Sequence, residues 1–499
     1  MAPTLRTIAT RRRTMSPGLS VIQTGFRPVL RMALLLLPGL IVSGCSIFNS
    51  VGNTLFGTGG PQPGQPGYVK GFLGEVVADE PRAALAGKEV LSGGGNAADA
   101  AVAVGLSLAV TLPSRAGLGG GGACIAYTSD RRGASKGMPE AIMFVAPPVV
   151  SVGGGDRPAA VPMLARGIYL LHARHGKQPF DSLIAKAEQM ARFGVPVSHA
   201  LARDLALVSG PLFADPAARA VFGPAGTPLV AGQALSQPEL ASTLAQLRVS
   251  GVGDLYQGLL ARRIEQSSPS AGVPIGFNDL RAALPALATP VAILLGDDQV
   301  AFPPTDGGVA AAAALMALKR DPTDLQNALS RSIAAAQRWR AGGANSDQVL
   351  NGELVAPATL PLYPASTTFA TLDPDGNAVV CAVTMNNLFG TGRMLPGLGF
   401  LAAASPTSVT PPLLATGLAW NPNISAFHVA AGGSGQAGAA LADAIALYNA
   451  VRTGQPMQTL VPDPGRANVI SCARYLPGSD SSCGAVGDPR DYGLAIGGQ

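Results

Sequence analysis

The segment YPASTTFATLDPDGNAVVCAVTMNNLFGTG, residues 363–392, decides how this chain is interpreted. Two runs rich in β-branched and apolar residues, 369–372 and 379–383, suit β-strands. The residues between them, Asp-Pro-Asp-Gly-Asn at 373–377, are typical of a turn, because proline fixes φ while glycine and asparagine accept a positive φ. The segment therefore predicts a β-hairpin.

Hydroxyl side chains lie at the open end of this hairpin. Pairing the two arms symmetrically about the turn places Thr384 roughly opposite Ser366 and Thr367. If the chain is cut directly before one of these residues, the freed α-amine can act as a base for the hydroxyl on the same residue, with Thr384 as an orienting partner. Serine and threonine are common at strand ends, so the cluster alone does not establish a catalytic site.

The composition predicts a globular protein with a sizeable core. Of the 499 residues, 47% are apolar and only 13% are charged. The net charge of +5 comes from the N-terminal segment, because residues 1–45 hold six arginines and no acidic residue, and without them the charge is −1. The remaining chain offers no basic stripe for phosphates, which excludes a nucleic-acid partner.

The N-terminal segment has the pattern of an export signal. Residues 1–45 end in an apolar run and in Val-Ser-Gly-Cys, which resembles the bacterial lipobox, where cleavage leaves Cys45 as a lipidated N-terminus. An ordinary signal peptide or membrane anchor is the alternative. We favour the lipoprotein, because a Gly/Pro/Gln-rich tether follows within 46–70. This predicts an exported protein anchored in a membrane and facing the periplasm, with Ser46 favouring the outer membrane.

The other cysteines and the histidines form no metal-ligand pattern, so we expect no metal. Cys472 and Cys483 lie close in sequence, and in an exported protein we expect them to form a small disulfide loop. Cys124 and Cys381 lie in apolar, strand-like runs, where we expect buried free thiols.

The sequence predicts mostly helices in the first two thirds of the chain and more strands in the last third. A uniformly apolar helix is expected after Asn96, which suits an N-cap, and another from Asp181 to Gly194. The glycines 119–122 lack the sequence context of a phosphate-binding loop, so a tight backbone crossing is expected there. Further helices are expected at 236–248, 308–318, 324–340 and 437–451, and further strands at 123–127, 142–145 and 427–430.

Five segments, in order, resemble the γ-glutamyltranspeptidase family of N-terminal-nucleophile hydrolases. They are GGGNAADAAVAVGLSLAV (93–110), GLGGGG (117–122), GKQPFDSLIAKAEQMARFGVPVS (176–198), LDPDGNAVVCAVTMNNLFGTG (372–392) and GGSGQAG (432–438). The resemblance runs from about Gly74 to Gln458. It implies an α+β fold, a four-layer αββα sandwich, made as a precursor that cleaves itself into two associated subunits. Residues 71–365 would be the large-subunit-like part and 366–499 the small-subunit-like part of one intertwined domain.

The resemblance also assigns catalytic roles. Ser366 falls on the family's nucleophilic threonine, so that self-cleavage would follow Ala365, and Thr384 falls on its helper threonine. The family motif is Thr-Thr-His where this chain has Ser-Thr-Thr, and a shift of one residue would make Thr367 the nucleophile.

Substrate contacts are implied in the same way. Asn386 falls on a substrate-contacting asparagine, and Gly432 and Gly433 fall on the glycine pair whose backbone N–H groups form the oxyanion hole. Donors aimed at a developing oxyanion are often the largest catalytic contribution.

Several of the family's other pocket residues are replaced. The arginine that grips the glutamyl carboxylate falls on Val145, and the residues that hold the substrate amine fall near Ala404 and Ser405. The paired serines near the oxyanion turn fall on Leu414 and Ala415. The groups that recognise an amino-acid zwitterion are therefore changed, while those for acyl transfer are mostly kept.

Three functions follow from this pattern. The first is a γ-glutamyltransferase or glutathione hydrolase, in which Arg115 or Arg393 would supply the missing pocket arginine. The second is an acylase or amidase with a non-glutamyl substrate, and the third is an inactive lipoprotein that keeps the fold for binding. We predict an autoprocessing amide hydrolase or transferase for γ-glutamyl or related small acyl amides. It needs no cofactor, because nucleophile, base and oxyanion donors all come from the chain.

Overall fold

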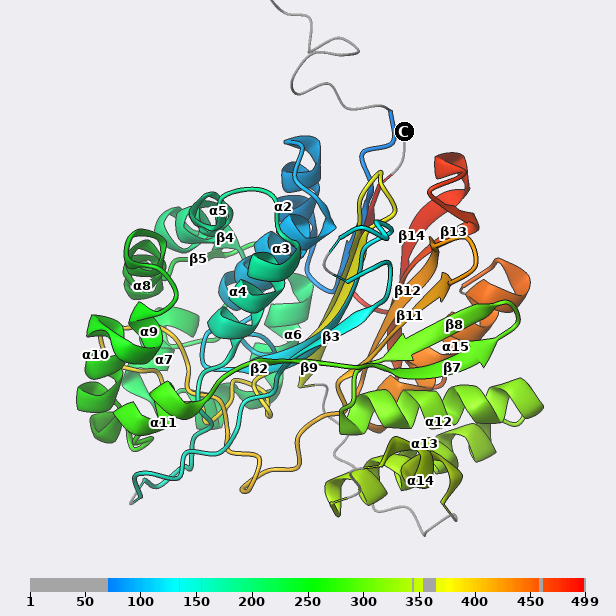
Figure 1. The fold of residues 1–499 in the computed structure, drawn as a ribbon. Helices are drawn as coiled ribbons and strands as arrows, with labels where there is room; N and C mark the ends of the chain where they lie inside the picture. Colours follow the sequence, from blue (N-terminus) through cyan, green and yellow to red (C-terminus); the bar gives the residue numbers. More distant parts are fainter. Residues whose placement is uncertain are drawn as a thin grey trace, which may run out of the picture. The chain divides into compact units, whose positions relative to one another are not determined.

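The computed structural model describes residues 71–133, 135–153, 155–342, 345–352, 365–456 and 461–497, apart from the side chain of Ala437 (Figure 1). The chain divides into the units Met1–Gly60 and Pro61–Gln499, and every described residue belongs to the second. The expected signal peptide, lipidation site Cys45 and tether therefore lie outside the described residues.

The predicted hairpin lies in the middle of a seven-stranded antiparallel sheet, in the order β15-β1-β9-β10-β2-β3-β6. Every residue of β9 and β10 is buried. The strands of this sheet are β1 (Glu75–Ala78), β2 (Gly121–Tyr127), β3 (Glu140–Phe144), β6 (Ala286–Ala288), β9 (Ser366–Leu372), β10 (Ala378–Thr384) and β15 (Leu494–Ile496).

A six-stranded antiparallel sheet packs against the first, in the order β14-β13-β12-β11-β8-β7. Its strands are β7 (Val291–Leu295), β8 (Asp298–Phe302), β11 (Ala415–Asn421), β12 (Ala426–Ser434), β13 (Arg466–Leu476) and β14 (Cys483–Gly487). A separate short pair joins β4 (Val195–Pro196) to β5 (Ala234–Leu235).

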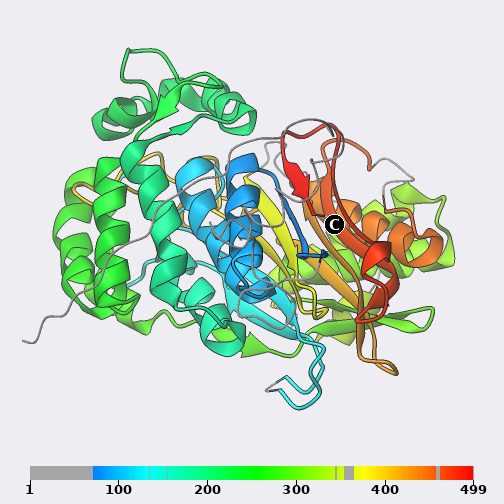
Figure 2. The same cartoon turned by 90° about the horizontal axis from the view of Figure 1, so that it is seen from above.

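Helices cover the outer face of each sheet (Figures 1 and 2). The seven-stranded sheet is covered by α2 (Pro81–Ser92), α3 (Ala97–Thr111) and α4 (Leu164–His175), with α5 (Phe180–Phe193) and α8 (Pro238–Ser250) packed outside them. The six-stranded sheet is covered by α12 (Asp306–Arg320) and α15 (Ala437–Thr453), with α13 (Leu325–Arg340) outside. The remaining helices are α6 (His199–Leu212), α7 (Pro216–Phe222), α9 (Asp254–Gln257), α10 (Leu259–Ser267), α11 (Phe277–Ala282) and α14 (Ser346–Asn351), with the 3₁₀ turns η1 (Ser268–Ala271) and η2 (Asp480–Ser482).

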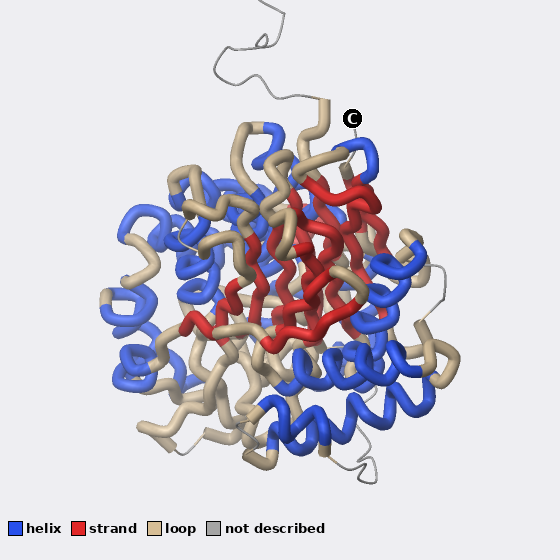
Figure 3. The backbone as a smooth tube through the Cα atoms, turned by 45° about the vertical axis from the view of Figure 1, so that its right-hand side comes forward, coloured by secondary structure: helices blue, strands red, loops and turns tan. Residues whose placement is uncertain are grey.

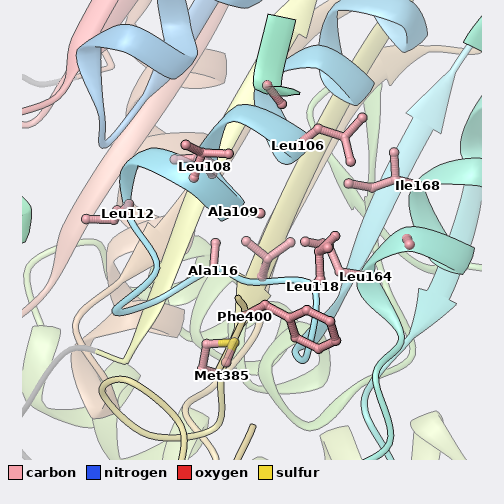
Figure 4. Close-up of a cluster of buried hydrophobic side chains, with 14 of the residues drawn as sticks. Leu106, Leu108, Ala109, Leu112, Ala116, Leu118, Leu164, Ile168, Met385 and Phe400 are labelled. Carbon is pink, nitrogen blue, oxygen red and sulfur yellow. The ribbon is translucent and has the colours of Figure 1, made fainter. Parts of the chain in front are cut away.

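Four layers require three apolar interfaces, and the buried side chains form three clusters. One lies between the seven-stranded sheet and its helices, where Leu106 of α3 lies near Ile168 of α4 (Figure 4). A second lies between the six-stranded sheet and α12 and α15. The third lies between the sheets and includes Tyr127 and Trp420. The predicted four-layer αββα sandwich of the α+β class is confirmed, with strands in the centre and helices on both sides (Figure 3).

The expected apolar helix after Asn96 is α3, and its sequence explains its position. The side chain of Asn96 accepts from Asp99 N at 2.9 Å, while the Asp99 carboxylate accepts from Asn96 N at 3.0 Å, which makes a capping box. All residues of α3 are buried, because this helix lies between the sheet and the outer helices. Within the described ranges, no helix is both long and apolar enough to cross a membrane.

Glycines 119–122 allow a close approach between two backbone segments, as the sequence predicted. A Cβ atom on Gly120 would lie 2.2 Å from the carbonyl oxygen of Thr384, and one on Gly122 would lie 2.3 Å from that of Ala382. Only glycine allows the loop before β2 and the start of that strand to approach the backbone of β10 this closely. The glycines thus place the Arg115 loop beside the open end of the hairpin.

Candidate active site

The turn fixes which residues meet at the open end of the hairpin. Gly376 adopts φ +82°, as the Asp-Pro-Asp-Gly-Asn sequence predicts. The resulting register pairs Thr384 directly with Ser366, and Val383 with Thr367. Because side chains alternate along a strand, Ser366 and Thr367 point to opposite faces of the sheet.

Ser366 and Thr384 lie around the peptide bond at which self-cleavage was predicted. The Thr384 hydroxyl donates to the carbonyl oxygen of Ala365 at 2.8 Å and accepts from the backbone N–H of Asn386 at 2.8 Å. The Ser366 hydroxyl is fully buried and has no hydrogen-bond partner among the described residues. A polarised carbonyl and an unpaired hydroxyl are thus present on the two sides of one peptide bond.

Thr367, the alternative nucleophile, is held by a buried polar network. Its hydroxyl donates to a carboxylate oxygen of Asp79 at 2.8 Å, and the backbone N–H of Thr368 donates to the same oxygen at 3.2 Å. The amide of Asn468, from the facing sheet, donates to the other oxygen at 2.5 Å. Burial raises the pKa of Asp79 to about 6, and Asp491 acts in the same direction, whereas Arg115 and the donors lower it.

Asp79 and Asn468 were missed by the sequence analysis. They lie 288 and 100 residues from the β9 residues that they bind, so no local pattern connects them. The one available signal was that an acidic residue follows the buried strand β1, which pairs with β9 through Ala78 and Phe369.

The predicted oxyanion glycines lie on β12 in the facing sheet. A Cβ atom on Gly432 would lie 2.8 Å from the Cβ of Thr368, and the Thr368 hydroxyl donates to the Gly432 carbonyl at 3.3 Å. Thr368 shares a sheet face with Ser366 because it lies two positions further along the strand. Gly432 and Gly433 therefore approach the face that carries the Ser366 hydroxyl, and their role as oxyanion donors stays a prediction.

Asn386 follows Thr384 in a left-handed conformation, with φ +63°. Its side-chain nitrogen donates to the carbonyl of Ala404 at 2.8 Å, which orients the amide. Its side-chain oxygen is buried and has no partner within the described part of the chain. An unpaired acceptor beside Ser366 suits an N–H group of a substrate. Met385, between Thr384 and Asn386, is anchored in the core near Leu118 and Phe400 (Figure 4).

The substituted pocket positions lie near these residues. Val145 directly follows Phe144, which pairs with Gly122, and β2 pairs Gly121 with Thr384. Ala415 pairs with Gly433. Both positions are thus at the same end of the sandwich as Ser366 and carry apolar side chains.

Arg115 and Arg393, the two candidates for the family's missing pocket arginine, have different surroundings. Arg115 is buried and makes a bidentate ion pair with Asp204 at 2.8 and 2.9 Å, which raises its pKa despite burial. Together with Arg203 and Ser434 it lines a pocket of about 180 Å³. Arg393 pairs instead with the half-exposed Asp156 at 2.7 Å. Arg115 thus lies beside the turn that follows Gly433, although its charge is already matched by Asp204.

Two disulfides join directly opposed strand residues. Cys472 of β13 is bonded to Cys483 of β14. Cys124 of β2 is bonded to Cys381 of β10, so the expectation of free thiols at these positions is wrong. The two apolar runs were correctly assigned to strands, but their pairing, which brings the sulfurs together, depends on the sheet order. Across the described ranges, His, Cys, Asp and Glu side chains form no group of three or more that could hold a metal ion.

Comparison with known proteins places the chain in a family. The family model described as Gamma-glutamyltranspeptidase matches residues 83–342, more than half of the chain. The chain belongs to the γ-glutamyltranspeptidase family, as its sequence motifs predicted.

Curated relatives include glutathione hydrolase 3 of Arabidopsis thaliana, 26% identical over 397 residues, with 69% of this chain and 62% of that protein covered. The glutathione hydrolase proenzyme of Escherichia coli (strain K12) is 27% identical over 383 residues, with 67% and 66% covered. The chain thus spans just under two thirds of these relatives' lengths.

Among solved structures, cephalosporin acylase from Bacillus halodurans superimposes with a TM-score of 0.69 at 19% identity, covering 88% of this chain and 98% of that chain. At this identity the likeness establishes the fold alone.

Proposed function

We propose that this protein is a self-cleaving amide hydrolase or acyl transferase whose nucleophile is Ser366, acting on γ-glutamyl or related small acyl amides. The observation that carries the proposal is the hydrogen bond from the Thr384 hydroxyl to the Ala365 carbonyl, next to the unpaired Ser366 hydroxyl. Membership of a family whose curated relatives include a glutathione hydrolase proenzyme supports it.

The first reaction is self-cleavage. The Ser366 oxygen attacks the Ala365 carbonyl, whose oxygen is polarised by Thr384, and the peptide nitrogen leaves as the α-amine of Ser366. The resulting ester between Ala365 and Ser366 is then hydrolysed by water. The products are a chain ending at Ala365 and a chain beginning at Ser366 with a free α-amine.

The second reaction is turnover of an external amide. The α-amine of Ser366 accepts the proton of its own hydroxyl, whose oxygen attacks the substrate carbonyl. The amide C–N bond then breaks, and the substrate amine leaves with that proton while its acyl group stays on Ser366 as an ester. The N–H groups of the Gly432–Gly433 segment would stabilise the oxyanion, and the free oxygen of Asn386 would accept from a substrate N–H. Water completes hydrolysis, and an amine acceptor completes transfer.

Ser366 is favoured over Thr367 as the nucleophile by their different surroundings. The Thr367 hydroxyl is occupied by Asp79 and points to the opposite face from Ser366. Ser366 is opposite Thr384 in the strand register, and its hydroxyl makes no hydrogen bond among the described residues.

A second candidate is an acylase with a non-glutamyl acyl group. The apolar Val145 and Ala415, at the same end of the sandwich as Ser366, favour it, because a zwitterion needs charged partners. The pocket beside Arg115 favours the glutamyl substrate instead, because Arg203 and Asp491 in its lining offer both signs of charge to a zwitterion. Comparing kcat/KM for a γ-glutamyl anilide with that for an uncharged acyl anilide of similar length decides between them.

The decisive test is the intact mass of the purified protein beside that of a Ser366→Ala variant. We expect two chains in the wild type, the smaller beginning at Ser366, and one uncut chain in the variant. A new N-terminus at Thr367 would move the nucleophile by one residue. An uncut wild-type chain with a cooperative unfolding transition would overturn the proposal and leave an inactive protein that keeps the fold.

Attachment to a membrane through lipidated Cys45 is a further part of the proposal, with the periplasmic face of the outer membrane as the expected location. It is supported by the lipobox-like residues before Cys45. Membrane fractionation of wild type and Cys45→Ala tests it. Release of the variant into the soluble fraction is expected, and unchanged distribution would contradict lipidation.

A further inference from the structure

The disulfide between Cys124 and Cys381 connects two parts of the chain that self-cleavage would separate. Cys124 lies in the part before Ala365, and Cys381 in the part that begins at Ser366, 257 residues later. The other disulfide, Cys472–Cys483, lies wholly in the second part. In the described residues, the Cys124–Cys381 bond is therefore the one covalent connection across the predicted cleavage site other than the backbone.

The two parts are interleaved in the sheet around this bond. The β9–β10 hairpin from the second part is inserted between β1 and β2 from the first. After cleavage, strand pairing and packing alone would hold β10 on β2, apart from the disulfide. Cys124 and Cys381 are directly opposed in the antiparallel pair, with Cα atoms 4.1 Å apart.

We propose that the mature protein is a covalent heterodimer, in which Cys124 of the larger piece is bonded to Cys381 of the smaller. This proposal rests on the proposed self-cleavage. Breaking the Ala365–Ser366 bond consumes one water and leaves the sulfur atoms untouched. The two pieces therefore stay one molecule after denaturation until a reductant acts on the disulfide.

The bond also holds the register of the catalytic strand. Cys381 lies three residues before Thr384 on β10, and the same strand pair aligns Thr384 with Gly121. A slip of one residue would turn the Thr384 side chain to the other face of the sheet. Both cysteines are fully buried, so a reductant reaches the bond only when the sheet opens.

The experiment is gel electrophoresis and intact mass of the wild-type protein, denatured in N-ethylmaleimide to block thiol exchange. Without reductant we expect one species with the mass of the uncut chain plus one water. With dithiothreitol, which gives two electrons and two protons to the disulfide and leaves as its cyclic disulfide, we expect two pieces.

The controls separate the two proposals. A Ser366→Ala chain should remain a single species with and without dithiothreitol. A Cys472→Ala/Cys483→Ala variant should behave as wild type. Two pieces that separate without reductant would overturn the covalent heterodimer while leaving self-cleavage intact. One piece under both conditions, with no N-terminus at Ser366, would overturn self-cleavage itself.

Refolding of the cleaved protein provides a second readout. With the link intact, reassembly is intramolecular and its yield should not depend on protein concentration. A cleaved Cys124→Ala/Cys381→Ala variant should recover with a yield that rises with concentration. Equal concentration dependence in linked and unlinked protein would contradict the tethering role.

Discussion

At its turn, the β9–β10 hairpin satisfies the buried Asp373 carboxylate with four donors, namely the backbone N–H groups of Ala97, Asp375 and Asn377 and the Asn377 amide. At its open end, the Ser366 hydroxyl and the Asn386 side-chain oxygen are buried without a partner among the described residues. Unsatisfied buried polar atoms are costly, and the proposed function would account for the two at the open end. The turn is a satisfied, structural end of the hairpin, and the open end is where we propose the chemistry.

The largest expected effect is that of Thr384→Val on self-cleavage. Removing the donor to the Ala365 carbonyl should slow the appearance of the smaller piece roughly 10²–10³-fold, as for loss of one oxyanion donor. The matched control is Thr371→Val, which removes a hydroxyl that donates to the Ala97 carbonyl near the turn. The control should cleave at the wild-type rate. Equal slowing in both variants would mean that hairpin stability, and not carbonyl polarisation, limits cleavage.

At the turn, Asp373→Ala should lower the free energy of unfolding by about 3 kcal/mol, because it leaves buried donors unpaired. The exposed Asp375 provides the matched control, and Asp375→Ala should change stability by less than about 0.5 kcal/mol. Urea denaturation of uncut Ser366→Ala protein measures both without interference from cleavage. A small effect of Asp373→Ala would show that the turn sequence alone holds the hairpin.

Asp79 connects the open end to the facing sheet, and its titration should be visible in stability. With a pKa raised from 3.8 to about 6 in the folded protein, the folded state binds more protons than the unfolded state in this window. The contribution of Asp79 to stability is therefore present at low pH and is lost as pH rises through about 6. Between pH 4 and 7 the loss amounts to about 2 kcal/mol, since one pKa unit is 1.36 kcal/mol and part of the effect falls below pH 4.

Measuring unfolding free energies of wild type and Asp79→Asn from pH 4 to 7 tests this. The wild type should lose stability relative to the variant as pH rises. The opposite trend would mean that the three donors lower the pKa of Asp79 more than burial raises it.

The smallest effect is expected for the stability of Ser366→Ala. Its buried hydroxyl makes no hydrogen bond to a described residue, so its removal should raise the unfolding free energy by about 1 kcal/mol. The neighbouring Thr367→Val removes the bond to Asp79 and should cost about 1–3 kcal/mol. Both are measured in the Thr384→Val background, in which cleavage is slow, so that variant and reference are compared as uncut chains. A strongly destabilised Ser366→Ala protein would argue for a structural role of the hydroxyl.

Local patterns in the sequence were sufficient for much of the fold. The turn residues and β-branched runs determine the hairpin, and the capping pair Asn96 and Asp99 starts α3. Ordered family motifs predicted the four-layer architecture. Strands β7 and β8 were not predicted, although Gly296-Asp297 between two apolar runs is a turn signal that could have indicated their hairpin.

The amino-acid sequence by itself determined the hairpin, its register, and therefore the meeting of Ser366 with Thr384, because these depend on neighbouring residues and on turn chemistry. Only the tertiary structure decided that Thr367 is held by Asp79 and that Cys124 is bonded to Cys381. Both contacts join residues more than 250 positions apart. Their partners are set by the order of strands in the sheet, which depends on how the layers bury their apolar faces and not on any local pattern.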